Sequence, residues 1–450
     1  MRPDPRGRGE RMGKAMKAFR GGIAAPHNKH TENCATEAMG VPARIIIPMV
    51  QHIGAPCAPL VQKGDRVTVG QKIGDNDAFI SSPIHASASG TVADVRPILY
   101  AGGVEVVSVE IETDGAQETC PDIRPPATDR ESLIKAIRES GIVGLGGAGF
   151  PTAVKLSPPA DKKIDILVLN GAECEPYITS DYREMMENPG GIIEGARIIM
   201  ELAKIPRALI GIEANKPEAI RLLTDTVKDD PAIDVVTLRT RYPQGGEKQL
   251  IYATTGRRVP AGGLPSDIGV LVQNTTTASF IAGFVKTGMP LIKKKVTVDG
   301  SAMATPKNVE VLIGTPLKDV FEFCGGFREE PVKIIMGGPM MGVAQFSLDN
   351  TVIKQTNALL ALGAREVALK PEIVCIKCGR CVSACPMGLL PLYLNACMER
   401  GLFERMADDY HVSDCIECGC CSYVCPSARR LVQSIRYGKA ELRKLAAKKK

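Results

Sequence analysis

The sequence predicts a multidomain protein that combines α/β and α+β domains. The chain has 450 residues, enough for about three domains. It is 44% hydrophobic and 24% charged, as ordinary globular proteins are. Helical and strand-like hydrophobic patterns alternate between residues 128 and 290, and two copies of one cysteine pattern lie near the C-terminal end. These features indicate a central α/β domain flanked by smaller domains of other architecture.

The N-terminal part is expected to be an irregular arm followed by an all-β domain. Residues 1–42 are predicted to be an arm that packs late or against a partner, because glycine and proline interrupt any periodic pattern. Residues 43–115 contain the strand-like runs Arg44–Pro48 and Val104–Ile111. The phrase VQKGDRVTVGQKIG, with SSPIHASASGTVADV after it, resembles the barrel-sandwich hybrid of lipoyl and biotinyl domains. Those domains carry a modified lysine at a hairpin tip, whereas Asp75–Pro83 contains none, so the resemblance implies an unmodified scaffold.

Residues 128–290 are predicted to form a largely parallel α/β domain. The predicted helices are Glu131–Ser140, Ile192–Lys204, Pro217–Lys228 and Ala278–Thr287, and the predicted strands are Asp165–Asn170, Ala208–Glu213, Asp234–Arg239 and Gly269–Gln273. Asp129 is the predicted N-cap of the first helix. Because helices and strands alternate, the strands are expected to lie parallel in one sheet. Residues 291–366 change to short strands around one helix, which indicates a small α+β module.

The cysteine pattern predicts two [4Fe–4S] clusters. The copies are Cys375-x2-Cys378-x2-Cys381-x3-Cys385-Pro386 and Cys415-x2-Cys418-x2-Cys421-x3-Cys425-Pro426. Three cysteines spaced in this way hold one side of a cubane cluster, and in two-cluster ferredoxins the fourth ligand comes from the other copy. The predicted ligand sets are therefore Cys375, Cys378, Cys381 and Cys425 for one cluster, and Cys415, Cys418, Cys421 and Cys385 for the other.

The alternatives to clusters are zinc sites or a disulfide framework. Zinc usually shows paired C-x2-C units at wider spacing, which disfavours it here. Cys420, directly beside Cys421, is interpreted as a non-ligand because the spacing favours Cys421. Residues 367–435 are thus predicted to be a two-cluster ferredoxin-like domain, followed by a basic tail at residues 436–450.

Composition excludes several functions. The chain has no Trp and 4% aromatic residues, so it offers no base-stacking platform for nucleic acid. It has no apolar run of 18 residues that could span a bilayer, and its basic N-terminus lacks the apolar segment of a secretory signal. Fifteen cysteines without such a signal indicate a reducing compartment. The net charge of +6 is concentrated in Arg2–Arg20 and Lys439–Lys450, which are either solvated tails or attract an anionic membrane or acidic partner.

A glycine-rich loop is the first candidate binding segment of the α/β region. The stretch SGIVGLGGAGFPTAVKL satisfies G-x-G-x-x-G at Gly144, Gly146 and Gly149. It follows a predicted helix rather than a strand, which excludes the ordinary dinucleotide fingerprint. Its glycines still allow backbone N–H groups to approach a phosphate or a ring closely. A tight turn with no ligand is the alternative.

Further candidate residues follow the predicted strands, at the edge where open α/β sheets bind ligands. They are Asn170, Glu173 and Glu175 in NGAECEP, Glu247 in YPQGGEK, and Asn274 and Thr275 in VQNTTTA. The alternative for the acids is a solvated loop. For Asn274 and Thr275 the alternative is capping of the following helix.

Taken together, these motifs resemble a known family. GGAGFPTAVKL, NGAECEP, YPQGGEK and VQNTTT look like the flavin- and NADH-binding subunit of respiratory complex I. The barrel, the glycine-rich loop, GGPMMG at Gly337–Gly342 and the double cysteine motif occur in this order in RnfC, the C subunit of the Rnf ion-translocating ferredoxin:NAD oxidoreductase. The chain resembles that family more closely, from about Gly21 to Leu442. The resemblance implies a Rossmann-like FMN/NAD domain at residues 128–290 and an SLBB β-grasp module at residues 291–366.

The same resemblance implies a role for each candidate residue. Gly144, Gly146, Gly147 and Gly149 would line FMN, Lys155 would neutralise its phosphate, and Asn170, Glu173, Asn274 and Thr275 would contact the flavin. Phe150, Glu175 and Glu247 would meet NAD(H), with Phe150 stacking on the nucleotide and the two acids in catalytic roles. The chain departs from complex I at Leu145, where complex I has Arg, at Ala172, where it has an acid, and before Glu247, where one acid is lost.

The implied function is that of an NAD(H)-dependent FMN and iron–sulfur oxidoreductase subunit. FMN would exchange hydride with NAD(H), and single electrons would pass through the two [4Fe–4S] clusters. The implied partners are the Rnf membrane subunits and their ferredoxin-type B subunit, with this chain peripheral on the cytoplasmic face of the cell membrane. Two alternatives stay open. One is a stand-alone reductase such as a cobalamin reductase, against which the barrel argues. The other is an iron–sulfur relay and docking subunit without nucleotide binding.

Overall fold

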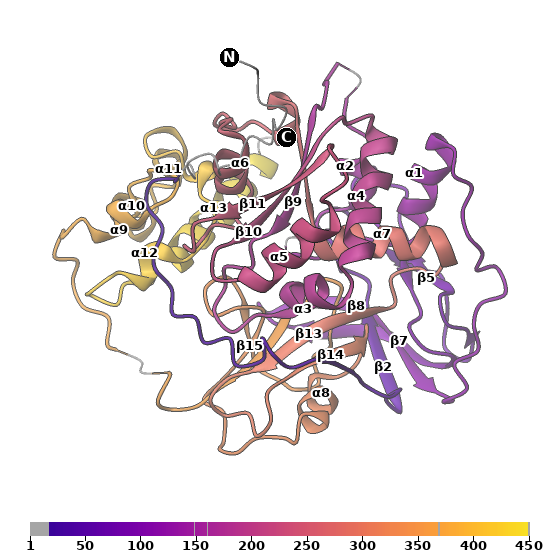
Figure 1. The fold of residues 1–450 in the computed structure, drawn as a ribbon. Coiled ribbons are helices and arrows are strands. Elements are labelled where there is room, and N and C mark those ends of the chain that lie inside the picture. Colours follow the sequence, from indigo (N-terminus) through magenta and orange to yellow (C-terminus); the bar gives the residue numbers. More distant parts are fainter. Residues whose placement is uncertain (1–17, 148, 160, 368–369, 449–450) are drawn as a thin grey trace, which may run out of the picture.

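The computed structural model describes residues 18–147, 149–159, 161–367 and 370–448 (Figure 1). Within them an all-β unit, an α/β unit, an α+β unit and a small helical unit with the cysteine motifs follow one another along the chain. The predicted mixture of α/β and α+β units is confirmed. Most of the basic stretch Arg2–Arg20 and the last two lysines lie outside the described residues.

The all-β unit consists of two small antiparallel sheets around one core. One sheet has the order β2-β8-β7-β4 and the other the order β3-β5-β6. The strands are β2 (Arg44–Pro48), β3 (Ala58–Pro59), β4 (Arg66–Val67), β5 (Lys72–Asp75), β6 (Ile84–His85), β7 (Gly90–Tyr100) and β8 (Val104–Thr113). Alternating apolar side chains such as Ile45, Ile47, Val109 and Ile111 point between the sheets and are fully buried. The unit is therefore held by its own core.

The α/β unit is built on a parallel sheet with the order β11-β10-β9-β12. The strands are β9 (Ile166–Gly171), β10 (Ala208–Glu213), β11 (Ile233–Leu238) and β12 (Val270–Asn274). The helices are α1 (Arg130–Glu139), α2 (Thr152–Lys155), α3 (Ser180–Glu187), α4 (Pro189–Ala203), α5 (Pro217–Thr226), α6 (Glu247–Thr255) and α7 (Thr275–Thr287). Side chains of α1, α4, α5 and α7 pack in the core on one face of the sheet, and those of α6 pack on the other.

The strand order of this sheet reverses beside β9. β10 and β11 extend the sheet on one side of β9, whereas β12 returns to the other side. In open α/β sheets, the crevice at the carboxyl ends of the strands at such a switch point is the usual ligand site. By this topology, the expected ligand site is the crevice at the carboxyl ends of β9 and β12.

Local side-chain caps mark the start of some described helices, such as α1, and are absent from others, including α3 and α6. The carboxylate of Asp129 accepts a hydrogen bond from the Ser132 N–H at 3.0 Å, which is the predicted cap of α1. Helices α3 and α6 fall in segments that sequence analysis treated as binding loops. The first turn of α3 has no local side-chain cap. Its N–H groups at Asp181 and Tyr182 bond instead to Glu173 from the preceding loop, so the start of α3 depends on a tertiary contact.

The α+β unit contains a six-stranded mixed sheet with the order β1-β14-β13-β17-β15-β16. Its elements are β13 (Lys293–Asp299), β14 (Lys307–Leu312), α8 (Leu317–Phe323), β15 (Lys333–Met336), β16 (Val343–Gln345) and β17 (Ala358–Leu362). The sheet also includes β1 (Thr36–Ala38) from the N-terminal arm, which pairs in parallel with β14. The expectation of an irregular arm is wrong for these three residues, because the exposed edge of β14 offers them backbone partners.

The N-terminal arm ties the units together. In Figure 1 this indigo segment runs from the helical unit past β15 to β14. The Gly22 N–H donates to the carbonyl of Ala384 in the helical unit at 2.8 Å. The next residue, Ile23, forms a β-bridge with Tyr242 of the α/β unit. The described part of the arm thus packs within its own chain.

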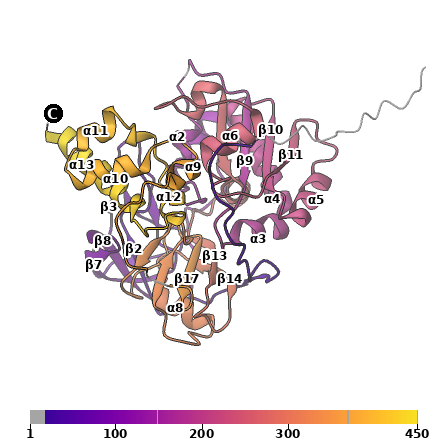
Figure 2. The ribbon, with the colours of Figure 1, turned by 90° about the vertical axis from the view of Figure 1, so that its left-hand side faces the viewer.

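The helical unit lies at one side of the molecule (Figure 2). It contains α9 (Arg380–Ala384), α10 (Pro391–Glu399), α11 (Phe403–Asp408), α12 (Cys420–Tyr423) and α13 (Leu431–Lys448). Leu394, Met406 and Ile435 form the centre of its core. Helix α13 continues without interruption from this core into the basic tail. Among the described helices, none is both long enough and apolar enough to cross a membrane.

Candidate functional site

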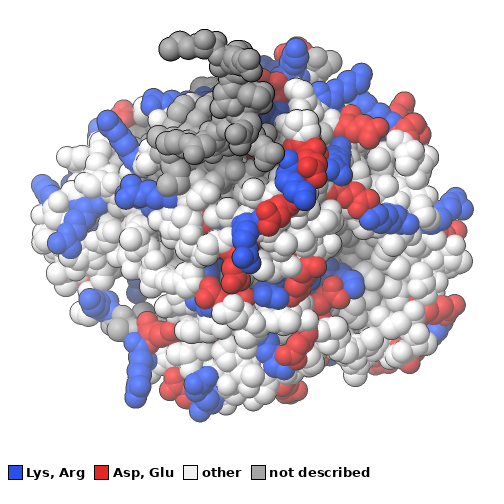
Figure 3. Space-filling model, viewed as in Figure 1, with Lys and Arg blue, Asp and Glu red and all other residues white. Residues whose placement is uncertain are grey.

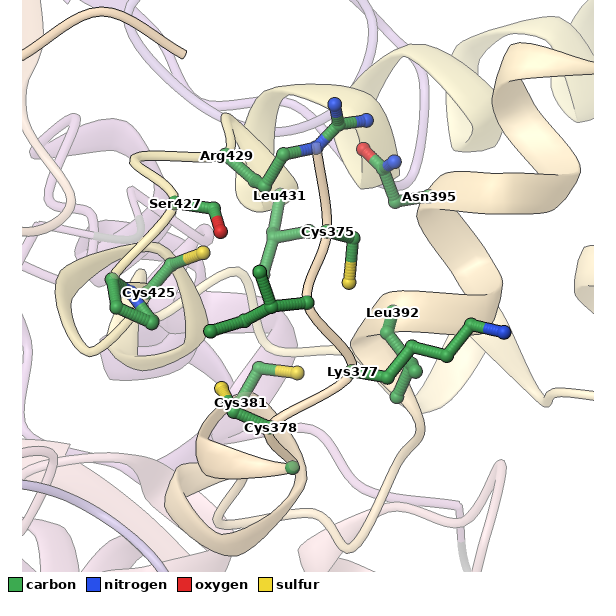
Figure 4. Close-up of a pocket in the computed structure, with 13 residues that line it drawn as sticks. Cys375, Lys377, Cys378, Cys381, Leu392, Asn395, Cys425, Ser427, Arg429 and Leu431 are labelled. Carbon is green, nitrogen blue, oxygen red and sulfur yellow. The ribbon is translucent and has the colours of Figure 1, made fainter. Parts of the chain in front are cut away.

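Four cysteines surround a cavity at the exposed edge of the helical unit. Figure 4 shows Cys375, Cys378, Cys381 and Cys425 around one space, which Leu392 also lines. Cys375 and Cys378 are exposed, whereas Cys381 is buried. Gly379 adopts a positive φ of 74° between the second and third cysteines, which glycine tolerates without strain. The loop can therefore fold back so that three cysteines face the same cavity.

A second cavity lies on the side of the helical unit that faces the α/β unit. It is lined by Cys385, Cys415, Cys418 and Cys421. Cys420 also lines it, is fully buried, and shares a hydrogen bond with the Cys418 thiol. The structure thus brings together both sets of four cysteines that were predicted from the sequence, each with three from one motif and one from the other.

The donor sets fit two cubane clusters. Among the described residues, no group of three or more His, Cys, Asp or Glu side chains is arranged to hold a single metal ion. Four thiols around a cavity suit a [4Fe–4S] cluster better than a zinc ion, whose ligands converge on one point. Burial raises the pKa of Cys415 to about 11 and that of Cys421 to about 12. Burial therefore disfavours the thiolate form of both side chains unless a cationic group offsets their charge, as bound iron would.

The glycine-rich loop is closed by its own backbone. The Gly144 N–H donates to the carbonyl of Phe150 at 2.8 Å, and the Gly149 N–H donates to the carbonyl of Gly144 at 3.2 Å. Gly147 has a φ of 107°, a conformation that side chains disfavour. Gly146 and Gly147 are exposed, and their N–H groups bond to no other described residue. The loop therefore offers free backbone donors to a ligand.

This loop lies at the switch point of the sheet. The Leu145 N–H donates to Thr277 Oγ1 in the first turn of α7 at 3.0 Å. Gly146 lies so close to Asn274 that an added β-carbon would be 3.2 Å from the Asn274 amide nitrogen. Asn274 and Asn170 are register partners at the ends of β12 and β9. Free N–H groups, two asparagines and a helix N-terminus thus meet at the switch point of the sheet, and these groups fit a phosphate-bearing flavin.

Asn274 and Thr275 also perform the predicted alternative role. Asn274 caps α7 by accepting a hydrogen bond from the Thr277 N–H at 3.2 Å, and its amide donates to Asp181 at 2.7 Å. Thr275 is fully buried, and its hydroxyl donates to the Asn170 carbonyl at 3.4 Å. These contacts hold the ends of β9 and β12 in place. They also give the polar side-chain atoms of both residues hydrogen-bond partners within the chain. Contact of either residue with flavin stays a prediction.

Lys155 and Glu247 form an ion pair with 3.0 Å between Nζ and Oε1. Lys155 also donates to the carbonyl of Val272 in β12. The resemblance assigned Lys155 to a phosphate and Glu247 to NAD(H), and the structure places the two side chains against each other beside the crevice. An incoming phosphate would therefore compete with Glu247 for the Lys155 ammonium.

Glu173 is turned away from solvent. Its carboxylate accepts the Asp181 N–H at the start of α3 at 2.7 Å, and Lys29 of the N-terminal arm lies 3.9 Å away. The Lys29 ammonium also donates to the carbonyls of Glu173, Glu175 and Ile178. Burial raises the pKa of Glu173 and lowers that of Lys29. Flavin contact by Glu173 stays a prediction, since the structure gives its carboxylate a helix-capping role.

Glu175 joins the α/β unit to the GGPMMG loop of the α+β unit. Its carboxylate accepts hydrogen bonds from the N–H groups of Met340 at 3.0 Å and Met341 at 2.9 Å. Gly338 passes so close that an added β-carbon would lie 2.4 Å from Oε2. Burial raises the pKa of Glu175 to about 7. This carboxyl group can therefore gain or lose a proton near neutral pH.

Tyr242 is a functional candidate that sequence reasoning missed. Its side chain is buried, and its hydroxyl donates to the carbonyl of Cys418 at 2.8 Å. It belongs to the YPQGGEK motif that carries Glu247, so it links the loop of this motif to the second cysteine cavity. Its place in the motif gave no signal of this contact, because 176 residues separate the partners.

Family models match four successive parts of the chain. They are the RnfC barrel-sandwich hybrid domain at residues 17–116, the Nuo51 FMN-binding domain at residues 137–283, the SLBB domain at residues 295–344 and the 4Fe–4S dicluster domain at residues 374–428. These matches confirm the predicted barrel-sandwich, FMN, SLBB and two-cluster units of the fold.

Curated relatives match over nearly the whole chain. The C subunit of the proton-translocating ferredoxin:NAD(+) oxidoreductase complex of Clostridium ljungdahlii is 46% identical over 97% of this chain and 96% of its own length. The C subunit of the Na(+)-translocating ferredoxin:NAD(+) oxidoreductase complex of Acetobacterium woodii is 45% identical over 94% of this chain and 97% of its own length. Among solved structures, a chain of an NAD+-reducing [NiFe]-hydrogenase is 18% identical, with a TM-score of 0.49, over 68% of this chain and 61% of that chain.

Proposed function

This chain belongs to the C-subunit family of ion-translocating ferredoxin:NAD(+) oxidoreductase complexes, and we propose that it is the peripheral subunit through which electrons pass between NAD(H) and that complex. It is an oxidoreductase subunit with FMN and two [4Fe–4S] clusters as cofactors. The observation that carries the proposal is the contact between Tyr242 and Cys418, which joins the nucleotide-side loops to a cysteine cavity.

The sites form an ordered series. The crevice of the glycine-rich loop lies at the ends of β9 and β12, in the α/β unit that also supplies Tyr242. The second cavity faces this unit, and the Gln249 amide of α6 reaches Met387 on its wall at 3.2 Å. The first cavity has exposed ligands at Cys375 and Cys378. We infer that the second cavity holds the inner cluster of the electron path and that the first cavity holds the outer cluster. We call the first cavity the exit, because electrons would pass there between the chain and a partner.

Bound FMN would exchange a hydride with NAD(H) and release the two electrons one at a time to the clusters. The free N–H groups of Gly146 and Gly147 would hold the flavin in the crevice, and Lys155 would bind its phosphate after separating from Glu247. Glu175, whose pKa is about 7, can hold or release a proton at its carboxylate oxygens. Tyr242 keeps the loop and the inner cavity in fixed contact.

The exit has a surface suited to an acidic redox protein. Ile373, Val374 and Ile376 around Cys375 are exposed, with Val374 81% accessible. Lys377 and Arg380 beside them are also exposed. Figure 3 shows mainly Lys and Arg among the charged side chains on the side of α9, α10 and α11. Apolar contact with basic residues around it favours an acidic partner, which we propose is the ferredoxin-type subunit of the complex.

The location proposed for this subunit is the cytoplasmic face of the membrane complex. All fifteen cysteines are free thiols in the structure. Thiol-rich chains persist in reducing compartments, and reducing conditions also protect thiolate-bound clusters. The basic end of α13 could add attraction to an anionic membrane surface.

Anaerobic purification and NADH reduction test the function. The intact chain should contain about eight irons and one FMN, as two cubane clusters and one flavin require. NADH should bleach the flavin absorbance and generate the electron paramagnetic resonance signal of reduced clusters. Eight irons without flavin, and without any response to NADH, would instead support the relay and docking alternative.

A further inference from the structure

A buried lysine of the α+β unit supports the glycine-rich loop from behind. Lys294 lies in β13 and is 6% exposed. Its ammonium donates to the carbonyl oxygen of Leu145 at 2.8 Å. The neighbouring Lys293 is exposed instead and pairs with Glu310 at 2.7 Å. Adjacent strand residues point to opposite faces, so one lysine faces the loop and the other faces solvent.

This contact sets the direction of a backbone donor. A trans peptide is planar, with its C=O and N–H on opposite sides. Lys294 holds the Leu145 carbonyl on the inner side, so the N–H of Gly146 in the same peptide points to the outer, exposed side. The Leu145 N–H is held separately by Thr277 of α7 at 3.0 Å. Two different units of the fold therefore fix this one residue of the loop.

Lys294 also brings charge to the crevice. Burial lowers its pKa to about 8, and the nearby carboxylate of Asp181 acts in the opposite direction. Asp181 is itself bound by Asn274 and Thr276, both at 2.7 Å. A protonated ammonium polarises the peptide group whose carbonyl it contacts, which makes the N–H of that peptide a stronger hydrogen-bond donor. The loop thus presents a stronger donor than an unsupported peptide would.

We propose that Lys294 is a positioning residue that orients the Gly146 N–H toward the bound flavin. The proposal rests on the proposed function, because it takes FMN as the ligand of the crevice. By this proposal, tight FMN binding needs a residue from outside the α/β unit, because Lys294 lies in the α+β unit. The α+β unit would then complete the flavin site as well as pack beside it.

FMN affinity of the holo-chain variants tests the proposal. Flavin is removed and titrated back, and its fluorescence quenching gives Kd without any turnover. Lys294→Met should weaken FMN binding about tenfold, which corresponds to about 1.4 kcal/mol. Lys294→Arg should restore most of the affinity, because it returns a charged donor to the same position. The exposed control Lys293→Met should bind FMN like the wild type.

The possible outcomes distinguish a failure of the role proposed for Lys294 from a failure of the function proposed for the chain. Equal affinity of wild type and Lys294→Met overturns the role of Lys294 while leaving the function intact. A wild-type chain that binds no FMN overturns the proposed function itself. If Lys294→Met lowers the iron content or the unfolding temperature, Lys294→Gln takes its place. This neutral donor should also weaken binding, and wild-type affinity in a folded Lys294→Gln chain would again refute the role.

Discussion

The hydroxyl of Tyr242 donates to the backbone carbonyl of Cys418 at 2.8 Å, across the boundary between the α/β unit and the helical unit. Tyr242→Phe would leave that carbonyl without its donor in a buried site. We expect a loss of about 1–3 kcal/mol in stability and a lower reduction potential of the inner cluster, because a hydrogen-bond dipole near its ligand is lost. Thermal unfolding and a redox titration followed by electron paramagnetic resonance measure both effects. Tyr423→Phe, at an exposed position, is the control, and identical potentials in the two variants would contradict the prediction.

Replacement of Glu175 should change the pH dependence of stability. The folded-state pKa of Glu175 is about 7, above its usual value of 4.5. Its contribution to stability is therefore fully present below pH 4.5 and is lost as the pH rises through 7. Glu175→Gln resembles the protonated form, so its unfolding temperature should fall less than that of the wild type between pH 5 and pH 8. Glu105→Gln on the exposed part of β8 should follow the wild type, and parallel curves for all three chains would refute the assignment.

Two adjacent cysteines should differ sharply in their importance for iron. Cys421 is a predicted cluster ligand, and Cys420 is not, although both line the inner cavity. Cys420→Ser should keep about eight irons per chain, whereas Cys421→Ser should fall to about four. Iron analysis of anaerobically purified protein decides between them. Loss of iron in Cys420→Ser with retention in Cys421→Ser would reverse the ligand assignment.

Charge reversal at the exit should slow transfer to an acidic partner. The double substitution Lys377→Glu and Arg380→Glu places two acids beside the exposed ligands Cys375 and Cys378. Stopped-flow reduction of a small acidic ferredoxin should slow about tenfold or more at low ionic strength, and the difference should shrink in high salt. Lys63→Glu on the all-β unit is the control, since its side chain is exposed in a different unit. An unchanged rate at low salt would place the exit elsewhere.

Short-range patterns carried most of the prediction. The spacing of the cysteines predicted the two sets of four that line the two cavities, because a cluster demands local loops of fixed length. The alternation of helix and strand specified the parallel sheet, and β10 was predicted to the residue at Ala208–Glu213. Where a local signal existed, as at Asp129, the helix boundary followed within one residue.

Contacts between distant segments could not be read from the sequence. Lys29 and Lys294 look like ordinary surface lysines in sequence, yet both are buried and bind backbone carbonyls of the site loops. From the sequence, Glu173 was expected to contact the flavin. Its capping of α3 could not be predicted, because the loop and the helix meet only in the folded chain. The Lys155–Glu247 pair likewise joins two motifs that sequence analysis treated separately.

The predicted crossed ligation also has a consequence for the order of events during synthesis. The outer cavity needs Cys425, and the inner cavity needs Cys385 together with cysteines of the later motif. Both sets therefore need cysteines of the later motif, so neither set of four thiols exists until the ribosome has reached that motif. The earlier units can fold as they emerge. Insertion of either iron–sulfur cluster would therefore follow synthesis of the all-β, α/β and α+β units.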